Sequence, residues 1–379
     1  MAKIKHLFFF FILFNLSAQS QQISVGAEQI DKYLDLLKNK RVGVIANHTS
    51  LINKVHIVDS LLDLEIKIVK IFSPEHGFRG NEDAGKKIND GIDKKTNLKI
   101  ISLYGKNKKP KTSQLEDLDV LVFDIQDVGV RFYTYLSTLH YIIQAAGENN
   151  IDVIVLDRPN PNISYIDGPV LEKEFSSFVG LHPVPILYGM TIGEYAKMIN
   201  GENWAKSKCN LTVIPIENYN REKAYDLPVR PSPNLPNSKS INLYASLCLF
   251  EGTSISVGRG TEYPFQHFGS PLLESNYSFV PVKGYGSSNP KHENKKCYGL
   301  DLRYIDIHLT EINLKWLINC YREIEDKGQF FNKFFDKLAG TNKLRQDIVK
   351  GLSDYEIKKS WEKDIANFNK IRKKYLIYD

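Results

Sequence analysis

Residues 119–126 read DVLVFDIQ, an apolar run whose polar side chains stand at its start and near its end. Such near-continuous apolar character is typical of a strand that is buried on both faces. Residues 151–156 (IDVIVL) repeat the pattern, and the residues between them, 135–149, have the spacing of an amphipathic helix. A buried strand, a helix and a second buried strand predict a parallel sheet with helices on its faces.

The alternation of strands and helices continues on both sides of this unit. Further strands are expected at residues 41–46, 64–72, 98–104 and 211–216, with a helix at 55–64. Another helix should start at Thr191, because Glu194 stands three residues later and completes a capping box. We therefore predict an α/β fold in which residues 21–230 form a Rossmann-like domain with a mostly parallel sheet.

A second domain is expected after the proline-rich segment LPVRPSPNLPN at residues 227–237, since four prolines interrupt any regular element. Residues 231–379 should form a smaller, mixed α+β C-terminal domain. Its expected helices lie at 242–251, at 312–325 and beyond the capping box of Ser353 and Glu356. Its expected strands lie at 277–283 and 300–307.

The first twenty residues have the pattern of a secretory signal peptide. Two lysines precede an apolar run at residues 7–16, and small residues follow, so cleavage is expected after Ser20. The run is too short to span a bilayer comfortably. We expect an exported protein, periplasmic or secreted, with no stable membrane insertion after cleavage.

Composition narrows the classes of partner. The 379 residues carry a net charge of +6 with 42% hydrophobic residues, and the lysines are dispersed without a dense arginine block. This is a basic solvated surface, and no nucleic-acid partner is expected. Four widely spaced cysteines, Cys209, Cys248, Cys297 and Cys320, leave disulfides and buried thiols both open and make a zinc site improbable.

Polar side chains follow four of the expected strands at the point where each strand ends. They are Asn47-His48-Thr49, Glu75-His76, Asp124 with Gln126-Asp127, and Asp157-Arg158 with Asn160. The carboxyl ends of parallel strands share one edge of the sheet, where ligands bind in such folds. We expect these clusters to converge on one pocket, although each alone could be a polar turn or a helix cap.

Motifs for several reaction classes are missing from the sequence. It has no phosphate-binding glycine motif after its first strand, no G-x-S-x-G and no H-E-x-x-H, so neither a nucleotide cofactor nor a metal is expected. Carboxylates, amides and aromatic residues such as Tyr133, Tyr135, Tyr263 and Phe265 remain. Aromatic faces with directed hydrogen bonds suit a sugar, and a glycosidase needs a protonated carboxyl group for the leaving oxygen.

Six segments, in order along the chain, resemble the exo-acting β-N-acetylmuramidase family, long catalogued as a domain of unknown function. They are GVIANHTS (43–50), FSPEHGFRG (72–80), DIQDVGVRFYTY (124–135), LDRPNP (156–161), PSPNLPN (231–237) and EGTSISVGRGTEYPFQHFGSP (251–271). The resemblance implies a cleft between a Rossmann-like domain and a smaller one. It also implies hydrolysis of terminal, non-reducing N-acetylmuramic acid from peptidoglycan fragments.

The resemblance also suggests roles for individual residues. Glu75 matches the acid of the family's S-P-E-H-G motif and is the expected catalytic carboxylate, with Glu262 and Asp127 as candidates for a second catalytic group. Arg131 and Arg158 are candidates for binding the lactyl carboxylate of muramic acid, or else they form structural ion pairs. The remaining expected substrate-binding residues are Asn47, His76, Arg79, Asp124, Gln126, Tyr133, Asp157, Asn160, Asn234, Arg259 and Phe265.

Two other functions stay open at this point. A non-catalytic wall-binding protein could use the same aromatic and amide cleft, and a nucleotide-dependent enzyme could share the fold. For the hydrolase, retention of anomeric configuration is favoured over inversion. The nucleophile would be a second carboxylate or the acetamido group of the substrate.

Overall fold

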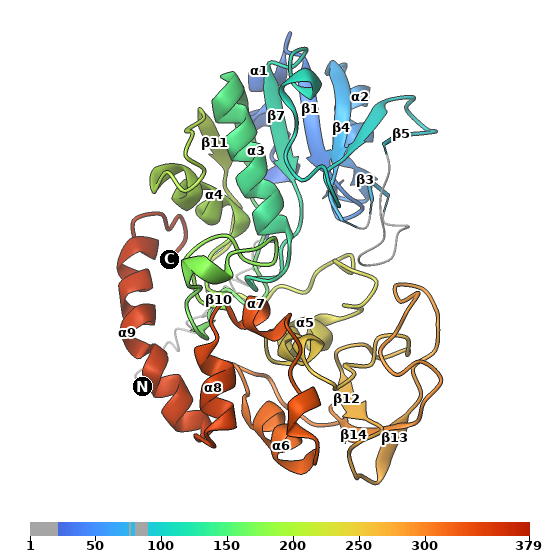
Figure 1. Ribbon diagram of the computed structural model, residues 1–379. Helices are drawn as coiled ribbons and strands as arrows, with labels where there is room; N and C mark the ends of the chain where they lie inside the picture. Colours follow the sequence, from blue (N-terminus) through green and yellow to red (C-terminus); the bar gives the residue numbers. More distant parts are fainter. Residues whose placement is uncertain (1–21, 76, 80–89) are drawn as a thin grey trace, which may run out of the picture.

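The computed structural model describes residues 22–75, 77–79 and 90–379, and seven strands of this described chain form one sheet (Figure 1). Across the sheet their order is β11-β8-β7-β1-β4-β6-β5, and every neighbouring pair is parallel except β5 with β6. The strands are β1 (Val42–Ala46), β4 (Ile68–Ser73), β5 (Gly91–Ile92), β6 (Lys99–Ser102), β7 (Val120–Asp124), β8 (Asp152–Leu156) and β11 (Leu211–Ile214).

The six parallel strands have the strand order of a Rossmann fold. Numbered along the chain as β1, β4, β6, β7, β8 and β11, they are arranged 3-2-1-4-5-6 across the sheet. The connections reverse direction between β1 and β7, and a crevice at the carboxyl ends of such a pair is the usual ligand site. The predicted α/β, Rossmann-like architecture is confirmed.

Both faces of the sheet are covered, as the apolar strand patterns predicted. On β1, Val44 packs into the core cluster that includes residues of α1 (Leu34–Leu37) and α2 (Ile57–Asp63). Its neighbour Ile45 points to the opposite cluster, which includes residues of α3 (Tyr135–Asn149) and α4 (Ile192–Gly201). The helix predicted at residues 55–64 starts two residues late, because Val55 and His56 pair with Leu51 and Ile52 first.

Short elements connect these layers. The hairpin strands are β2 (Leu51–Ile52), β3 (Val55–His56), β9 (Ile166–Asp167) and β10 (Leu187–Tyr188). The 3₁₀ turns are η1 (Gly26–Glu28), η2 (Ile30–Lys32), η3 (Thr112–Gln114), η4 (Lys173–Phe175), η5 (Cys248–Gly252) and η6 (Lys327–Gln329).

The C-terminal part of the described chain combines helices with a small antiparallel sheet of order β12-β14-β13. The strand predicted at residues 300–307 was largely wrong, since β14 ends at Asp301 and the Arg303 side chain folds back onto the Asp301 carboxylate. The elements are α5 (Ser238–Leu247), β12 (His267–Ser270), β13 (Tyr277–Phe279), β14 (Cys297–Asp301), α6 (Lys315–Glu323), α7 (Phe335–Ala339), α8 (Lys343–Val349) and α9 (Asp354–Arg372).

The chain ends beside the large sheet. Helix α9 runs along one side of the molecule toward α4 (Figure 1), and the Tyr378 hydroxyl donates to Asp157 Oδ2 at 2.6 Å, just past the end of β8. The larger hydrophobic cluster continues from the sheet into the C-terminal helices. The division at residues 230 and 231 stays a prediction. All four cysteines are free thiols, which settles the question that their spacing left open.

Candidate active site

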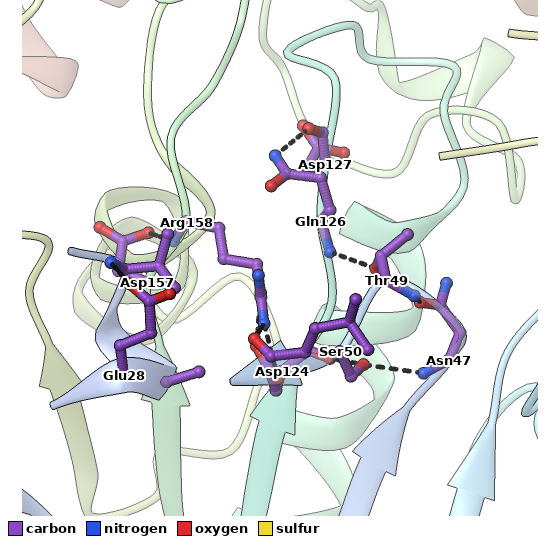
Figure 2. Close-up of polar contacts among 12 residues, drawn as sticks. Glu28, Asn47, Thr49, Ser50, Asp124, Gln126, Asp127, Asp157 and Arg158 are labelled. Carbon is purple, nitrogen blue, oxygen red and sulfur yellow. Dashed lines mark hydrogen bonds and ion pairs between the residues drawn. The ribbon is translucent and has the colours of Figure 1, made fainter. Parts of the chain in front are cut away.

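The carboxyl ends of β1, β7 and β8 carry a buried polar network (Figure 2). The Arg158 guanidinium forms two hydrogen bonds with the Asp124 carboxylate, at 2.6 and 2.9 Å. Asn47 accepts from the backbone N–H of Thr49 at 2.9 Å and donates from Nδ2 to the Tyr135 hydroxyl at 2.9 Å. The polar clusters after these strands therefore meet at one edge of the sheet, but their side chains are buried and bond to one another. The expectation that all four clusters share one pocket was wrong, because Glu75 lines a separate cavity.

Other predicted site residues join the same buried network. Gln126 donates to the carbonyl oxygen of Pro159, and Asp127 accepts from the Gly129 N–H at 2.7 Å and from the Tyr188 hydroxyl. Burial raises the pKa of Asp127 to about 6, although these two donors oppose the rise. Its Oδ1 is buried with no hydrogen-bond partner among the described residues.

Asp157 accepts hydrogen bonds from Thr191 and the Gly193 N–H as well as Tyr378. Burial raises its pKa to about 7 against the effect of these donors. Asn160 holds the Met190 carbonyl through Nδ2 at 2.9 Å. Each of these side chains is occupied in fixing a loop at the sheet edge.

The two arginines predicted to bind a lactyl carboxylate are both buried. Arg158 is 4% exposed and paired with Asp124, and Arg131 is 2% exposed. Arg131 has no carboxylate partner among the described residues, and burial lowers its pKa to about 9. Its guanidinium donates instead to the carbonyl oxygens of Pro169, Val184, Leu338 and Ala339. Tyr133 is also buried, with its hydroxyl bonded to the Pro231 carbonyl.

A cavity of about 590 Å³ lies between the β4 end of the sheet and the C-terminal part of the chain. Glu75, on the loop directly after β4, lines it together with Glu251 and Arg259 from the C-terminal half. Its walls are mainly aromatic and small polar residues. They are Tyr104, Phe132, Thr134, Phe178, Val179, Tyr244, Cys248, Gly286, Ser287, Ser288, Asn289, Phe334 and Leu338.

Two hydroxyl-bearing side chains of this cavity interact with Glu75. Thr134, the residue before α3, donates from Oγ1 to Glu75 Oε2 at 3.0 Å and makes no side-chain hydrogen bond to the helix that it precedes. Burial raises the pKa of the Tyr104 hydroxyl, and the charge and hydrogen bond of Glu75 add to the rise. The acid is thus oriented by fixed groups at the wall of an open cavity.

Glu251 and Arg259, which line the same cavity, form an ion pair, with Arg259 Nε 3.0 Å from Glu251 Oε1. Glu251 lies in η5, and Arg259 follows on the loop before β12. The Arg259 guanidinium lies 5.0 Å from the ring centroid of Phe265, which fixes its plane against an aromatic face. Both side chains are about one-quarter exposed, so they can reach a ligand.

The remaining predicted residues lie elsewhere. Glu262 and Asn234 line a second cavity, described below, and Phe265 is fully buried behind Arg259. Arg79 forms two hydrogen bonds with Asp93, at 3.0 and 2.7 Å, and these lower the pKa of Asp93 to about 2. His76 and residues 1–20, the predicted signal peptide, lie outside the described residues.

Sequence reasoning did not select Glu251, Thr134 or Tyr104. Glu251 could have been selected from the sequence, because it is the first residue of the segment EGTSISVGRG, which also contains Arg259. The separation of eight residues, however, does not predict that the two side chains line the same site. Thr134 lies in the family-like segment at residues 124–135, but nothing there distinguished it from its neighbours, and Tyr104 lies in none of the six segments. Residue spacing along the chain does not reveal which side chains a Rossmann-like sheet and a distant loop bring together.

Within residues 22–75, 77–79 and 90–379, no group of three or more His, Cys, Asp or Glu side chains could hold a metal ion. No helix in the same ranges is long and apolar enough to cross a membrane.

Comparisons with known proteins agree on one family. Residues 42–239 match the family model described as exo-β-N-acetylmuramidase NamZ, N-terminal, and residues 242–378 match its C-terminal counterpart. The chain is 40% identical over 391 aligned positions to the peptidoglycan β-N-acetylmuramidase NamZ of Bacillus subtilis strain 168, covering 96% of this chain and 93% of that protein.

Two crystal structures of DUF1343 family proteins from Bacteroides fragilis NCTC 9343 are also similar. One is 44% identical with a TM-score of 0.87, and the other is 29% identical with a TM-score of 0.82. Each alignment covers 94% of this chain and 99% of the other.

Proposed function

Since the chain belongs to the exo-β-N-acetylmuramidase NamZ family, we propose that it hydrolyses terminal, non-reducing N-acetylmuramic acid from peptidoglycan fragments. The observation that carries the proposal is the cavity that holds Glu75, Glu251 and Arg259 among aromatic side chains. Two carboxyl groups around a pocket of sugar size fit the two-carboxylate scheme of glycoside hydrolysis, and Arg259 adds a cation that can pair with a carboxylate of the substrate.

Glu75 is the general acid in this proposal. It gives its proton to the glycosidic oxygen as the bond from that oxygen to the anomeric carbon breaks, and water supplies the hydroxyl of the released sugar. The Thr134 hydroxyl, 3.0 Å from Oε2, holds the carboxyl group in one orientation. This supports the role because a general acid works only within hydrogen-bond reach of its acceptor.

Glu251 is our candidate for the second carboxylate. Together with Glu75 it supplies the carboxyl groups that line the cavity in the described residues, whereas Asp127 is buried and Glu262 lines the neighbouring cavity. It would stabilise the positive charge that develops at the anomeric carbon. Its ion pair with Arg259 holds the carboxyl group in place at the cavity wall.

Arg259 is our candidate for binding the lactyl group of the substrate. This group carries a carboxylate and distinguishes muramic acid from glucosamine. The Arg259 Nε is bonded to Glu251, and the described residues offer no hydrogen-bond acceptor to its two terminal nitrogens. A guanidinium edge held in place beside a cavity matches a carboxylate in a bidentate manner. Arg131 and Arg158 are instead engaged inside the fold.

The test is the Glu75→Gln variant with a chromogenic β-glycoside of N-acetylmuramic acid. The hydrolase proposal predicts that the variant turns over at least about 100-fold more slowly, with substrate affinity largely kept. A wall-binding protein without activity would release no chromophore even as wild type. If wild type instead cleaves the N-acetylglucosamine glycoside and leaves the muramic acid glycoside intact, the proposed specificity is wrong.

We also propose that the protein is exported, to the periplasm or beyond, which would place it where its substrate lies. The charged start, apolar run and small residues of positions 1–20 support this. N-terminal sequencing of the protein recovered outside the cytoplasm should begin at Gln21. A cytoplasmic protein that keeps Met1 would contradict it.

A further inference from the structure

A second cavity, of about 680 Å³, opens on the C-terminal part of the chain and has an aromatic lining. We call it the aromatic groove and define it by Tyr263, Tyr277, Phe279 and Tyr285, which come from the loop before β12, from β13 and from the loop after it. Tyr263 is 38% exposed and Tyr285 is 56% exposed. Large aromatic faces open to solvent in a concave site indicate a ligand rather than a core.

The rings of the groove are held in place before any ligand binds. Arg303 is fixed by two hydrogen bonds to Asp301, and its guanidinium lies 4.3 Å from the ring centroid of Tyr263 and 5.8 Å from that of Tyr277. Beneath them, the His267 ring stacks on Phe279 with centroids 4.1 Å apart. Rings that are already ordered lose little conformational entropy when a ligand stacks on them.

The groove adjoins the cavity that holds Glu75. Arg259 lines that cavity and the next residue, Gly260, lines the groove. The loop at residues 284–289 also lines both spaces, since Tyr285 lines the groove and Gly286 lines the cavity. Asn234, a groove residue, donates to the Gly286 carbonyl at 2.8 Å and fixes this shared wall.

We propose that the aromatic groove binds the part of the glycan chain that leaves, namely the sugars on the reducing side of the scissile bond. This rests on the proposed function, because an exo-acting enzyme encloses one terminal sugar and must let the rest of the chain pass out beside it. The C–H faces of β-linked N-acetylhexosamines stack on aromatic rings. The remainder of the strand therefore lies along Tyr263 and Tyr285.

Polar groups in the same groove complete the match to an N-acetylated, partly anionic glycan. Arg230, whose guanidinium lies 4.9 Å from the Tyr285 ring, and Arg303 are cations that can meet the lactyl carboxylate of a later muramic acid. Glu262, exposed at the groove edge, accepts hydrogen bonds from sugar hydroxyls. In this proposal Glu262 binds sugars that lie away from the scissile bond and takes no part in its cleavage.

The experiment compares two substrates in each variant. One is the chromogenic monosaccharide glycoside, and the other is a peptide-free tetrasaccharide of alternating N-acetylmuramic acid and N-acetylglucosamine with muramic acid at its non-reducing end. In Tyr263→Ala and Tyr285→Ala, the ratio of kcat/KM for the tetrasaccharide to that for the monosaccharide should fall about three- to tenfold. In Tyr285→Trp the ratio should stay at or above the wild-type value, because the stacking face is kept.

Tyr355→Ala is the matched control. Tyr355 is 71% exposed and lies 5.9 Å from a lysine ammonium, but it stands on α9 away from the groove. An unchanged ratio in both groove variants, or an equal fall in Tyr355→Ala, would overturn the proposal. A fall seen only with peptide-bearing fragments would also overturn it and would place the stem peptide in the groove. Absence of monosaccharide cleavage by wild type would instead refute the proposed function.

Discussion

Replacing Arg259 with methionine should remove the preference for muramic acid over glucosamine. Methionine keeps an unbranched, apolar side chain at this position but removes the guanidinium, which lies 5.0 Å from the Phe265 ring centroid. The substrate's lactyl carboxylate would then face the cavity without its cation. The N-acetylglucosamine glycoside has no such group, so its turnover reports any general damage to the site.

The size of the effect follows from the geometry of Arg259. Its side chain is 25% exposed, so its hydrogen bonds to a carboxylate are partly screened by water. A charge-assisted hydrogen bond contributes about 1.5–3 kcal/mol. One such bond corresponds to a fall of about 10- to 150-fold in the ratio of kcat/KM values for the two glycosides. Arg259→Lys should recover only part of this, because an ammonium cannot bind both oxygens in one plane.

The assay is initial-rate hydrolysis of the two chromogenic glycosides at one pH and ionic strength. Arg345→Met serves as the matched control, since Arg345 forms the same kind of ion pair with Asp336 at 2.8 Å but lies on α8. If Arg259→Met lowers hydrolysis of the N-acetylmuramic acid and N-acetylglucosamine glycosides equally, Arg259 stabilises the site but does not bind the lactyl group. A preference that is unchanged from wild type would refute the assignment outright.

Glu251→Gln should slow turnover about 100-fold with little change in KM, because Glu251 stabilises the positive charge at the anomeric carbon. If the variant turns over as fast as wild type, the second catalytic carboxylate is not Glu251, and Glu262 and Asp127 are the next candidates. Tyr378→Phe should lower the free energy of unfolding by about 1–3 kcal/mol, measured with urea, because the Ile216 N–H and Asp157 each lose a buried partner. Ionised Asp93 should add to the free energy of unfolding above about pH 4. This stabilisation should be lost as pH falls through 2, because the folded pKa of about 2 lies below the unfolded value of about 3.9. Arg79→Met should therefore lower the free energy of unfolding by about 1 kcal/mol at pH 6, a value reduced because water screens the partly exposed arginine. The variant should lower it little below pH 2. Retention of configuration is expected, so proton NMR should detect the β-anomer of the released sugar first, and an α-anomer formed first would exclude it.

Local sequence signals determined several helices of the chain. The helix expected at residues 135–149 has those bounds, and the capping boxes of Thr191 with Glu194 and Ser353 with Glu356 both form. These features depend on neighbours within four residues, so the sequence alone contains the information. The strand expected at residues 300–307 depended instead on a partner strand and on how Arg303 folds back to Asp301, and it was misplaced.

The resemblance of six segments identified the family, and polarity at the strand ends located the edge of the sheet that carries Glu75. The direction in which each side chain points was decided by tertiary structure. Burial at the sheet edge demands a partner for every charge and amide, so Asp124 binds Arg158 and Arg131 is surrounded by carbonyl oxygens. Glu251 reaches the cavity only because the C-terminal half folds back over the end of β4, more than 170 residues away in sequence.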